Sequence, residues 1–286
     1  SLHRGQIEKL LKASIFKDFS KIYQFANPEQ RKFLDLYSRR YEIRVLKEIM
    51  TNLFDHKSTD AVDVSPYCDF FRRHSKLDLD RLTACTTMDE FINTLKGNEF
   101  YVPLSRIQNH DTALLFDYGM ALDLYYFSMI WNVRKKLFSG KDLEQITTAY
   151  GEKFDMLNLQ FISRSKRYFS MAPADIYALL IPMNYKLKKE EITALVEAST
   201  REEAQQIFRK TYYGKKYDHL SAHNLEEFYN YMLRTTLEKA SRKDPYSVAM
   251  LYSYMYQHEV NRLTIAIECI RYGVAPDEAM QYIRNN

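Results

Sequence analysis

The chain of 286 residues is long enough for about two domains, and its formal net charge of +4 is too small to require a nucleic acid or an anionic membrane as partner. Seven glycines and seven prolines are few for this length, which favours long helices over turn-rich sheets. The 23 tyrosines and 17 phenylalanines suit large contacts between helices.

The first predicted element contains a five-residue opening pattern that returns twice further along the chain. The three copies are Leu10, Ala13, Ser14, Asp18 and Phe19; Leu82, Cys85, Thr86, Glu90 and Phe91; and Leu195, Ala198, Ser199, Glu203 and Ala204. Thr87 with Glu90, and Thr200 with Glu203, have the spacing of a capping box, in which a hydroxyl and a carboxylate bind free N–H groups at a helix start. Each unit is therefore predicted to open with a short helix, a break and a second helix.

A signature helix is predicted three times. Its first copy starts at Asn27 and Pro28, which are typical of a helix N-cap and first turn, and runs to about Leu53. The repeated pattern is a tyrosine, an aromatic residue or histidine, an acid, an aliphatic residue and a leucine, at matching spacings. The copies are Tyr37, Tyr41, Glu42, Ile43 and Leu46; Tyr150, Phe154, Asp155, Met156 and Leu159; and Tyr254, His258, Glu259, Val260 and Leu263. Gly273 is the predicted left-handed cap of the third copy.

A further apolar helix is predicted in the second and third units. Its residues are Leu122, Asp123, Tyr125, Tyr126, Met129 and Ile130 in one copy, and Leu225, Glu226, Phe228, Tyr229, Met232 and Leu233 in the other. Leu122 lies 33 residues before Asp155 (155 − 122), and Leu225 lies 34 residues before Glu259 (259 − 225). The first unit has no room for this helix and is predicted to be a reduced copy.

The predicted fold is all-α, in three related helical modules, because no alternating strand pattern of useful length occurs. We predict five segments: a reduced module one at residues 1–58, a polar connector at 59–80, module two at 81–170, a linker at 171–190 and module three at 191–286. A short tail helix is predicted after Pro276.

The sequence offers no complete motif for catalysis or ligand binding. Its Gly-Lys pairs lack the other residues of a phosphate-binding loop. His258 and Glu259 lack the second histidine of a zinc helix. His219 and His223 have Asp218 beside them, but no Cys or further His is near enough to complete a site. We therefore expect no catalytic, cofactor-binding or metal-binding residue.

Cysteine usage indicates the redox compartment, and hydropathy indicates whether a segment could cross a membrane. Cys68, Cys85 and Cys269 have no metal-like spacing, and their odd, sparse count suggests free thiols in a reducing compartment. The most apolar stretch, residues 171–185, contains Asp175, so no run of 18 uncharged apolar residues occurs. We expect no direct insertion into a membrane.

The signature acids, Glu42, Asp155 and Glu259, allow two interpretations. They could be three equivalent anionic contacts for a partner. They could instead be structural, each hydrogen-bonded to a tyrosine or capping a neighbouring helix. We favour the structural interpretation because buried acids are usually paired. The signature tyrosines are likewise predicted to lie in the core with a bonded hydroxyl.

Basic residues gather at 134–136, 164–167 and 186–189, and these clusters are predicted to be solvated helix ends. Residues 186–189 and 209–216 are also our candidates for peripheral contacts with a partner.

Four stretches together resemble the C-type subunit of prokaryotic V-type (A-type) ATPases, whose eukaryotic relative is the d-type subunit. They are YEIRVLKEIM from residue 41, ALDLYYF from 121, FDMLNLQFI from 154 and HEVNRLTIAIECI from 258. The resemblance covers nearly the whole chain, and family chains usually begin with a further helix before the equivalent of Leu10. It implies a funnel-shaped, pseudo-threefold helical protein without an active site or cofactor.

The resemblance also implies partners and a place. The protein would sit between the central shaft of the ATPase head, made of subunits of D and F type, and the membrane ring of proteolipid subunits. There it would act as a socket that couples rotation to proton or sodium transport, at the cytoplasmic face of the membrane. The main alternative is a helical-repeat adaptor with an unrelated cytosolic partner. A helical enzyme whose site is assembled from distant tyrosines and acids is a third interpretation, and no local pattern supports it.

Overall fold

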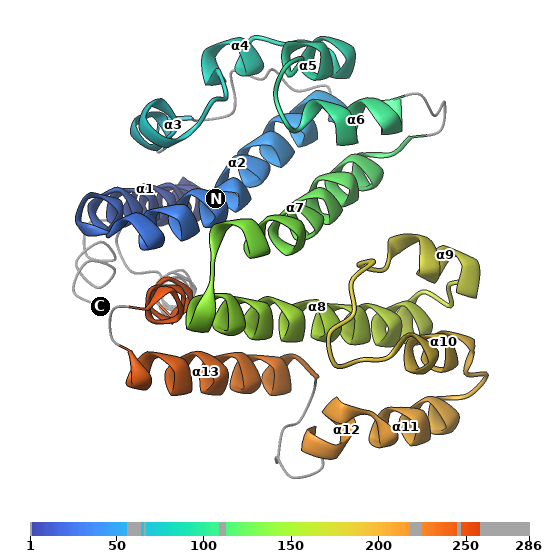
Figure 1. The fold of residues 1–286 in the computed structure, drawn as a ribbon. Helices are drawn as coiled ribbons and strands as arrows, with labels where there is room; N and C mark the ends of the chain where they lie inside the picture. The colour runs from blue at the N-terminus through green and yellow to red at the C-terminus, as the bar shows by residue number, and fades with distance from the viewer. Residues whose placement is uncertain are drawn as a thin grey trace. The chain divides into compact units, whose positions relative to one another are not determined.

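The fold is known from a computed structural model, which describes residues 2–55, 64–65, 67–108, 113–217, 225–244 and 247–257. No side chain is described before residue 13. The described residues form helices joined by turns and irregular segments, and none of them lies in a β-strand (Figure 1). The predicted all-α fold class is confirmed. Every described helix is too short or too polar to cross a bilayer.

The chain divides into two compact units. Unit 1 comprises residues 1–126 and 254–286, and unit 2 comprises residues 127–253. Helix α7, Leu115–Leu137, begins in unit 1 and ends in unit 2. It matches the apolar helix predicted for the second module. The division into three modules stays a prediction.

Unit 1 contains, besides the start of α7, the helices α1 Leu2–Phe25, α2 Pro28–Phe54, α3 Cys68–His74, α4 Leu79–Thr83, α5 Met88–Thr94 and α6 Tyr101–Gln108. Helix α2 packs against both α1 and α5. Its start agrees with the prediction, because the Asn27 side chain accepts a hydrogen bond from the Gln30 backbone N–H at 2.8 Å and Pro28 is the first helical residue. The first signature helix is therefore present with the expected limits.

The core of unit 1 includes an aromatic cluster where α1, α2 and α3 meet. The rings of Phe16 and Phe19 lie 5.0 and 5.7 Å from that of Tyr41, and Phe70 lies 5.2 Å from Phe19. These contacts are edge-to-face, the arrangement that aromatic quadrupoles favour. Phe70 belongs to α3, which lies inside the predicted polar connector. This helix was not predicted, because its few apolar residues stand between polar runs.

Unit 2 is built on α8, Gly140–Tyr168, which matches the second signature helix. Helix α13, Leu225–Lys243, lies along α8 and matches the apolar helix predicted for the third module (Figure 1). The other helices are α9 Pro173–Leu179, α10 Lys189–Glu197, α11 Arg201–Lys210 and α12 Tyr212–Tyr217. Residues 248–257 are also helical, and of these residues 248–253 belong to unit 2. Helix α10 packs against α8, α9 and α11.

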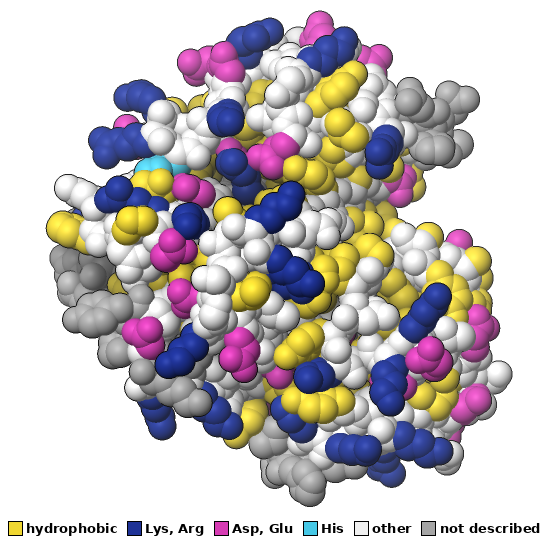
Figure 2. All heavy atoms as spheres, in the orientation of Figure 1, with side chains coloured by type: hydrophobic (Ala, Val, Ile, Leu, Met, Phe, Trp, Pro, Cys, Tyr) yellow, Lys and Arg dark blue, Asp and Glu magenta, His cyan; other side chains and the backbone are white. Residues whose placement is uncertain are grey.

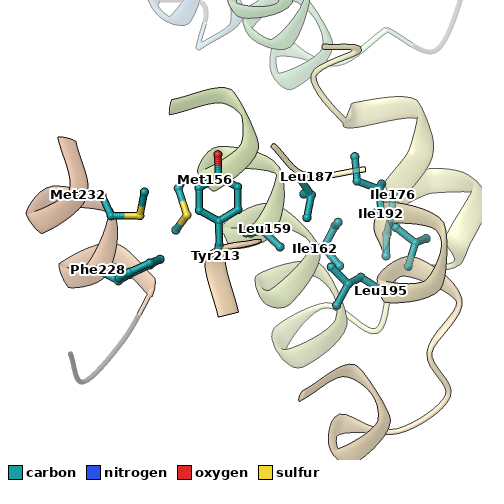
Figure 3. Packing of buried hydrophobic residues seen from close by; sticks show 11 residues of the cluster. Met156, Leu159, Ile162, Ile176, Leu187, Ile192, Leu195, Tyr213, Phe228 and Met232 are labelled. Atoms are coloured by element: carbon teal, nitrogen blue, oxygen red, sulfur yellow. The ribbon is translucent and has the colours of Figure 1, made fainter. Parts of the chain in front are cut away.

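The core of unit 2 is a cluster of buried residues from five helices and one irregular segment (Figure 3). Its members are Met156, Leu159, Ile162, Ile176, Leu187, Ile192, Leu195, Val196, Tyr213, Phe228 and Met232. Leu187 lies between α9 and α10, in the predicted linker. This linker therefore contributes to the core, and its backbone must find hydrogen-bond partners away from water.

The predicted break in the opening pattern is present in two copies and absent in the first. Helices α4 and α5 are separate, as are α10 and α11, whereas α1 runs through the pattern unbroken. Thr87 and Thr200 cap α5 and α11, each accepting a hydrogen bond from the backbone N–H three residues on, at 3.2 and 3.1 Å. The first copy has the buried Ile15 at the matching position, and isoleucine has no oxygen with which to cap a helix. The prediction of a break was therefore wrong for α1.

In both capping boxes the carboxylate reaches the residue before the N-cap. The carboxylate of Glu90 accepts a hydrogen bond from the backbone N–H of Thr86 at 2.9 Å, and that of Glu203 accepts one from Ser199 at 2.7 Å. Each carboxylate thus binds the residue before the cap. The repeated opening pattern includes Thr86 and Ser199, which explains why both copies share this detail.

Candidate functional site

The signature residues of the first two copies lie in the interior. Tyr37, Leu46, Tyr150 and Leu159 are all buried. The Tyr37 hydroxyl accepts a hydrogen bond from the Arg40 guanidinium. The Tyr150 ring stacks on a second tyrosine ring, with 5.2 Å between the ring centroids. Both copies therefore point their tyrosine and leucine toward a core.

The third copy differs where it is described. Tyr254 is 49% exposed, so its predicted core position is wrong. Tyr252 and Met255, three residues apart, form the buried face of this helix, and Tyr254 falls off that face. The remaining signature residues of this copy, Glu259 and Leu263, lie outside the described residues. So do the other predicted features at His219, His223, Cys269, Gly273 and Pro276.

Asp155 in α8 is fully buried and accepts four hydrogen bonds. Three come from consecutive backbone N–H groups: Tyr185 donates to Oδ1 at 3.0 Å, and Lys186 and Leu187 donate to Oδ2 at 2.6 and 2.9 Å. The fourth comes from the hydroxyl of Tyr213 in α12, at 2.8 Å from Oδ2. All four partners are donors, so the carboxylate acts as an acceptor only. Such saturation is what makes a buried carboxylate tolerable in a core.

The face of α8 that carries Asp155 also contacts other residues of the irregular segment between α9 and α10. The Asn158 side chain donates to the carbonyl of Ile181 at 3.0 Å and accepts from its N–H at 2.9 Å. The hydroxyls of Thr148 and Tyr185 lie 3.1 Å apart. Gly151 lies between these contacts, and a Cβ there would stand only 2.4 Å from Cγ of Tyr185. These positions on α8 are three or four residues apart, as one helix face requires.

Lys166, further along α8, binds the end of α10. Its Nζ donates to the carbonyl of Val196 at 2.6 Å and also to that of Ala198. A cation at a helix C-terminus satisfies carbonyls that have no partner in the helix and complements the helix dipole. One member of the basic cluster 164–167 is therefore a helix cap.

Arg134 corrects the prediction of a solvated cluster at residues 134–136. It is only 7% exposed, and its guanidinium lies over the ring of Trp131, 3.4 Å from the centroid. Its Nε donates to Thr147 in α8 at 3.0 Å. Lys135 and Lys136 are exposed, as predicted. The guanidinium is buried because stacking and hydrogen bonding replace part of its hydration.

Glu42 in α2 is 1% exposed and belongs to a network within unit 1. Its Oε1 accepts a hydrogen bond from the Ser75 hydroxyl, and its Oε2 forms an ion pair with Arg39 at 3.0 Å. Arg39 also pairs with Glu99 at 2.8 Å, and Glu99 accepts a hydrogen bond from the Tyr125 hydroxyl at 2.8 Å. The network joins α2 to the residue that follows α3, to the turn before α6 and to α7.

Both buried acids show the electrostatic effect of their surroundings. Burial raises the pKa of Asp155, while its three backbone donors and Tyr213 act in the opposite direction. Burial also raises the pKa of Glu42, and Arg39 and Ser75 oppose this. The pKa of the Tyr213 hydroxyl is raised by burial and by the negative charge of Asp155. The hydrogen bonds therefore offset part of the cost of burying each charge.

An exposed basic surface lies beside the Asp155 contacts. The Nζ atoms of Lys186 and Lys216 lie 5.9 and 4.4 Å from the ring centroid of Tyr212. Both lysines are exposed, and no described carboxylate forms an ion pair with either. We call Lys186, Tyr212 and Lys216 the lysine surface. Figure 2 shows further Lys and Arg side chains over α11 and α12.

The two acid sites are suited to holding chain segments in place. Their acceptor positions are occupied by donors, and no group of three or more His, Cys, Asp and Glu within the described ranges could hold a metal ion. The acids were identified from the sequence, but their partners Ser75 and Tyr213 were not, and neither was Asn158. None of these partners belongs to the repeated pattern. The only usable signal was that Leu187 is apolar within a linker.

Comparison with known protein families gives a match that covers nearly the whole chain. A family model described as ATP synthase (C/AC39) subunit matches residues 1–282. No curated protein matches the chain. The family match agrees with the resemblance found in the signature stretches.

Proposed function

This chain belongs to the ATP synthase (C/AC39) subunit family, and from this premise we propose that it is the non-catalytic socket of a rotary V-type ATPase or ATP synthase. In this role it connects the central shaft of the soluble head to the proteolipid ring in the membrane. Rotation then passes through it between ATP chemistry and the transport of protons or sodium ions. The family match over residues 1–282 carries the proposal and favours it over an unrelated helical-repeat adaptor.

The interior of each unit suits a part that transmits torque. A socket must keep its shape, because a part that yields would absorb the rotation it should pass on. Close-packed interiors deform little. In unit 1 the rings of α1, α2 and α3 interlock, and in unit 2 the cluster around Leu187 joins five helices to an irregular segment. The buried carboxylates Glu42 and Asp155 add directional bonds to this packing.

The lysine surface is our candidate for a peripheral contact. Its two ammonium groups flank one tyrosine ring. The buried carboxylate of Glu152 attracts both lysines, but neither lysine forms an ion pair with a described carboxylate. An acidic surface on a neighbouring protein of the complex, either the shaft or the ring, would supply carboxylates for direct ion pairs. Because both lysines are exposed, this attachment would weaken as salt is added. Attachment to the cytoplasmic face of the membrane would then occur through the ring.

Reconstitution of the ATPase with and without this chain tests the proposal. With the chain present, ATP hydrolysis should drive ion pumping into sealed vesicles, measured with a pH-sensitive or sodium-sensitive dye. Without it, the soluble head should still hydrolyse ATP while pumping stops. Coupled pumping that continues unchanged in the absence of the chain would refute the socket role. A chain that hydrolyses ATP by itself would refute the non-catalytic role.

A further inference from the structure

We propose that Glu42 and Asp155 are equivalent positioning residues, and that each fixes the segment leading into the next opening helix on the face of its own signature helix. We call these segments the first lead-in, residues 75–78 between α3 and α4, and the second lead-in, residues 180–188 between α9 and α10. The inference goes beyond the role of the chain in an ATPase, because it assigns a task to two particular side chains and stands without that role.

The two acids hold matching places in the sequence. Ser75, the donor to Glu42, lies 33 residues after it (75 − 42). The backbone donors to Asp155 lie 30 to 32 residues after it (185 − 155 to 187 − 155). The buried leucines of the next opening helices, Leu82 and Leu195, both lie 40 residues after their acids (82 − 42 and 195 − 155). This agreement indicates one joint that is built twice.

At the second lead-in, Asp155 replaces the partners that a helix or a strand would supply. Its three backbone donors, Tyr185, Lys186 and Leu187, lie in no helix or strand, yet their successive N–H groups point at one carboxylate. Buried backbone donors need a partner, and Leu187 is only 1% exposed. A neutral amide at this position would offer one oxygen instead of two and would turn its own NH₂ donor toward other donors. Only a carboxylate can accept from all of them.

At the first lead-in, one hydroxyl, that of Ser75, connects the segment to Glu42. Ser75 is the C-cap residue that follows α3, and it has extended backbone angles, with φ −125° and ψ 153°. Its Oγ donates to Glu42 and accepts from the N–H of Leu77 at 3.0 Å. The lead-in is thus fixed to α2, as the second lead-in is fixed to α8.

Each acid therefore fixes the segment from which an opening helix begins. Helix α4 starts directly after the first lead-in, and α10 starts directly after the second. Helix α10 then packs on α8, the helix that carries Asp155, and its far end is capped by Lys166. Helix α4 packs on α5, which in turn packs on α2, the helix that carries Glu42. In both cases the acid and the opening helix belong to the same compact unit.

Amide hydrogen exchange on the full-length chain tests this inference. In Asp155→Asn, the amides of residues 185–187 should exchange about tenfold faster than in the unaltered chain, because charge-assisted bonds hold them. The matched control is Asp142→Asn. Asp142 is also an acid of α8, but it accepts from the backbone N–H of Val248 at 3.2 Å rather than from a lead-in. This control should leave the exchange of residues 185–187 unchanged.

Two outcomes would overturn the inference. One is equal acceleration of residues 185–187 in both variants. The other is acceleration spread evenly over α8 and α13 in Asp155→Asn, which would indicate lost stability rather than a released segment. If Asp155→Asn does not fold, Ser75→Ala provides the test at the first lead-in, since it deletes a single hydroxyl. The amides of Arg81 and Leu82 at the start of α4 should then exchange faster than those of α2, and an even change across unit 1 would contradict the proposal.

Discussion

A buried carboxylate is the most informative kind of residue in this chain, because its cost must be offset by partners that can be named. Asp155 meets this condition with neutral donors alone, whereas Glu42 uses one cation and one hydroxyl. Removing such partners leaves a charge without compensation, which is far more damaging than deleting an exposed ion pair. The residues with the largest expected effects therefore lie in the interior and not in the basic clusters.

Gly151 provides a residue-level prediction about the fit between α8 and the second lead-in. Replacing glycine by alanine inside a helix ordinarily stabilises it by about 0.5–1 kcal/mol. In Gly151→Ala the new Cβ would meet the ring of Tyr185 at 2.4 Å, so we expect destabilisation by about 1–3 kcal/mol instead. Urea unfolding measures this difference.

The matched control is Gly119→Ala in α7. A Cβ there would lie 3.6 Å from Cε of Lys47, which is ordinary contact, so this variant should be slightly more stable than the unaltered chain. Stabilisation of both variants would show that Tyr185 is not tightly seated against α8.

His74 provides a prediction about pH. Its ring lies 4.4 Å from that of Tyr23, 5.5 Å from Phe19 and 5.6 Å from Phe70, and burial lowers its pKa. The unfolded chain therefore takes up a proton first as the pH falls. The stabilising contribution of the neutral ring is fully present above the unfolded pKa of about 6.5 and is lost as the pH falls toward the folded pKa.

His74→Phe should remove this dependence, because phenylalanine keeps the aromatic contacts and cannot be protonated. Nearby charges act on the imidazole in opposite directions, with Asp35 raising its pKa and Arg73 lowering it. The measurement is the urea midpoint of both proteins between pH 5 and 8. The difference between them should change mainly below about pH 6.5. A difference that is constant over the whole range would contradict the prediction.

At the scale of elements, the capping residues decide where helices break. Thr87→Ala should cost about 1 kcal/mol, because the N–H of Glu90 loses its acceptor at the start of α5. Thr87→Ser keeps the oxygen and should cost only a few tenths of that amount. Thermal unfolding of the two variants measures the difference. Equal losses would mean that the methyl group, and not the hydroxyl, matters at this position.

Helices with a long periodic pattern could be predicted from the sequence, and features that depend on one local atom or on distant partners could not. The signature and apolar helices α2, α7, α8 and α13 follow their predicted patterns because each buries a full face. The opening pattern failed only at Ile15, where one missing oxygen let α1 continue. Helix α3 was missed because a few aromatic residues in a polar stretch give no helical period.

The acids were predictable as repeated residues, but their contacts were not. Asp155 bonds backbone groups some 30 residues away, and backbone N–H groups look alike in every sequence. Glu42 depends on Ser75, an ordinary residue in the predicted connector. Tyr254 shows a different error, because its residue type fits the repeated pattern but its side chain is exposed. A repeat therefore identifies equivalent positions before it identifies equivalent environments.

At the scale of the whole molecule, the proposed function depends on how the chain binds its neighbours. The lysine surface predicts one such contact, because Lys186 and Lys216 are exposed around Tyr212 and form no ion pair with a described acid. The contact it would make is electrostatic, so it should affect attachment and salt dependence rather than folding. Surface substitutions of this kind usually change stability by less than about 0.5 kcal/mol.

Charge reversal by Lys186→Glu together with Lys216→Glu should weaken binding of the chain to the rest of the ATPase about tenfold, equal to about 1.4 kcal/mol. The loss should be largest at low salt, where exposed charges interact most strongly. Sedimentation with ring-containing membranes and with shaft subunits measures binding and shows which neighbour is involved. The matched control is Lys135→Glu with Lys136→Glu, an equal change of charge on the exposed end of α7. Equal weakening by both pairs would show that binding depends only on net charge, and it would exclude the lysine surface as a specific contact. With a specific contact, only the first pair should uncouple ion pumping from ATP hydrolysis at physiological salt.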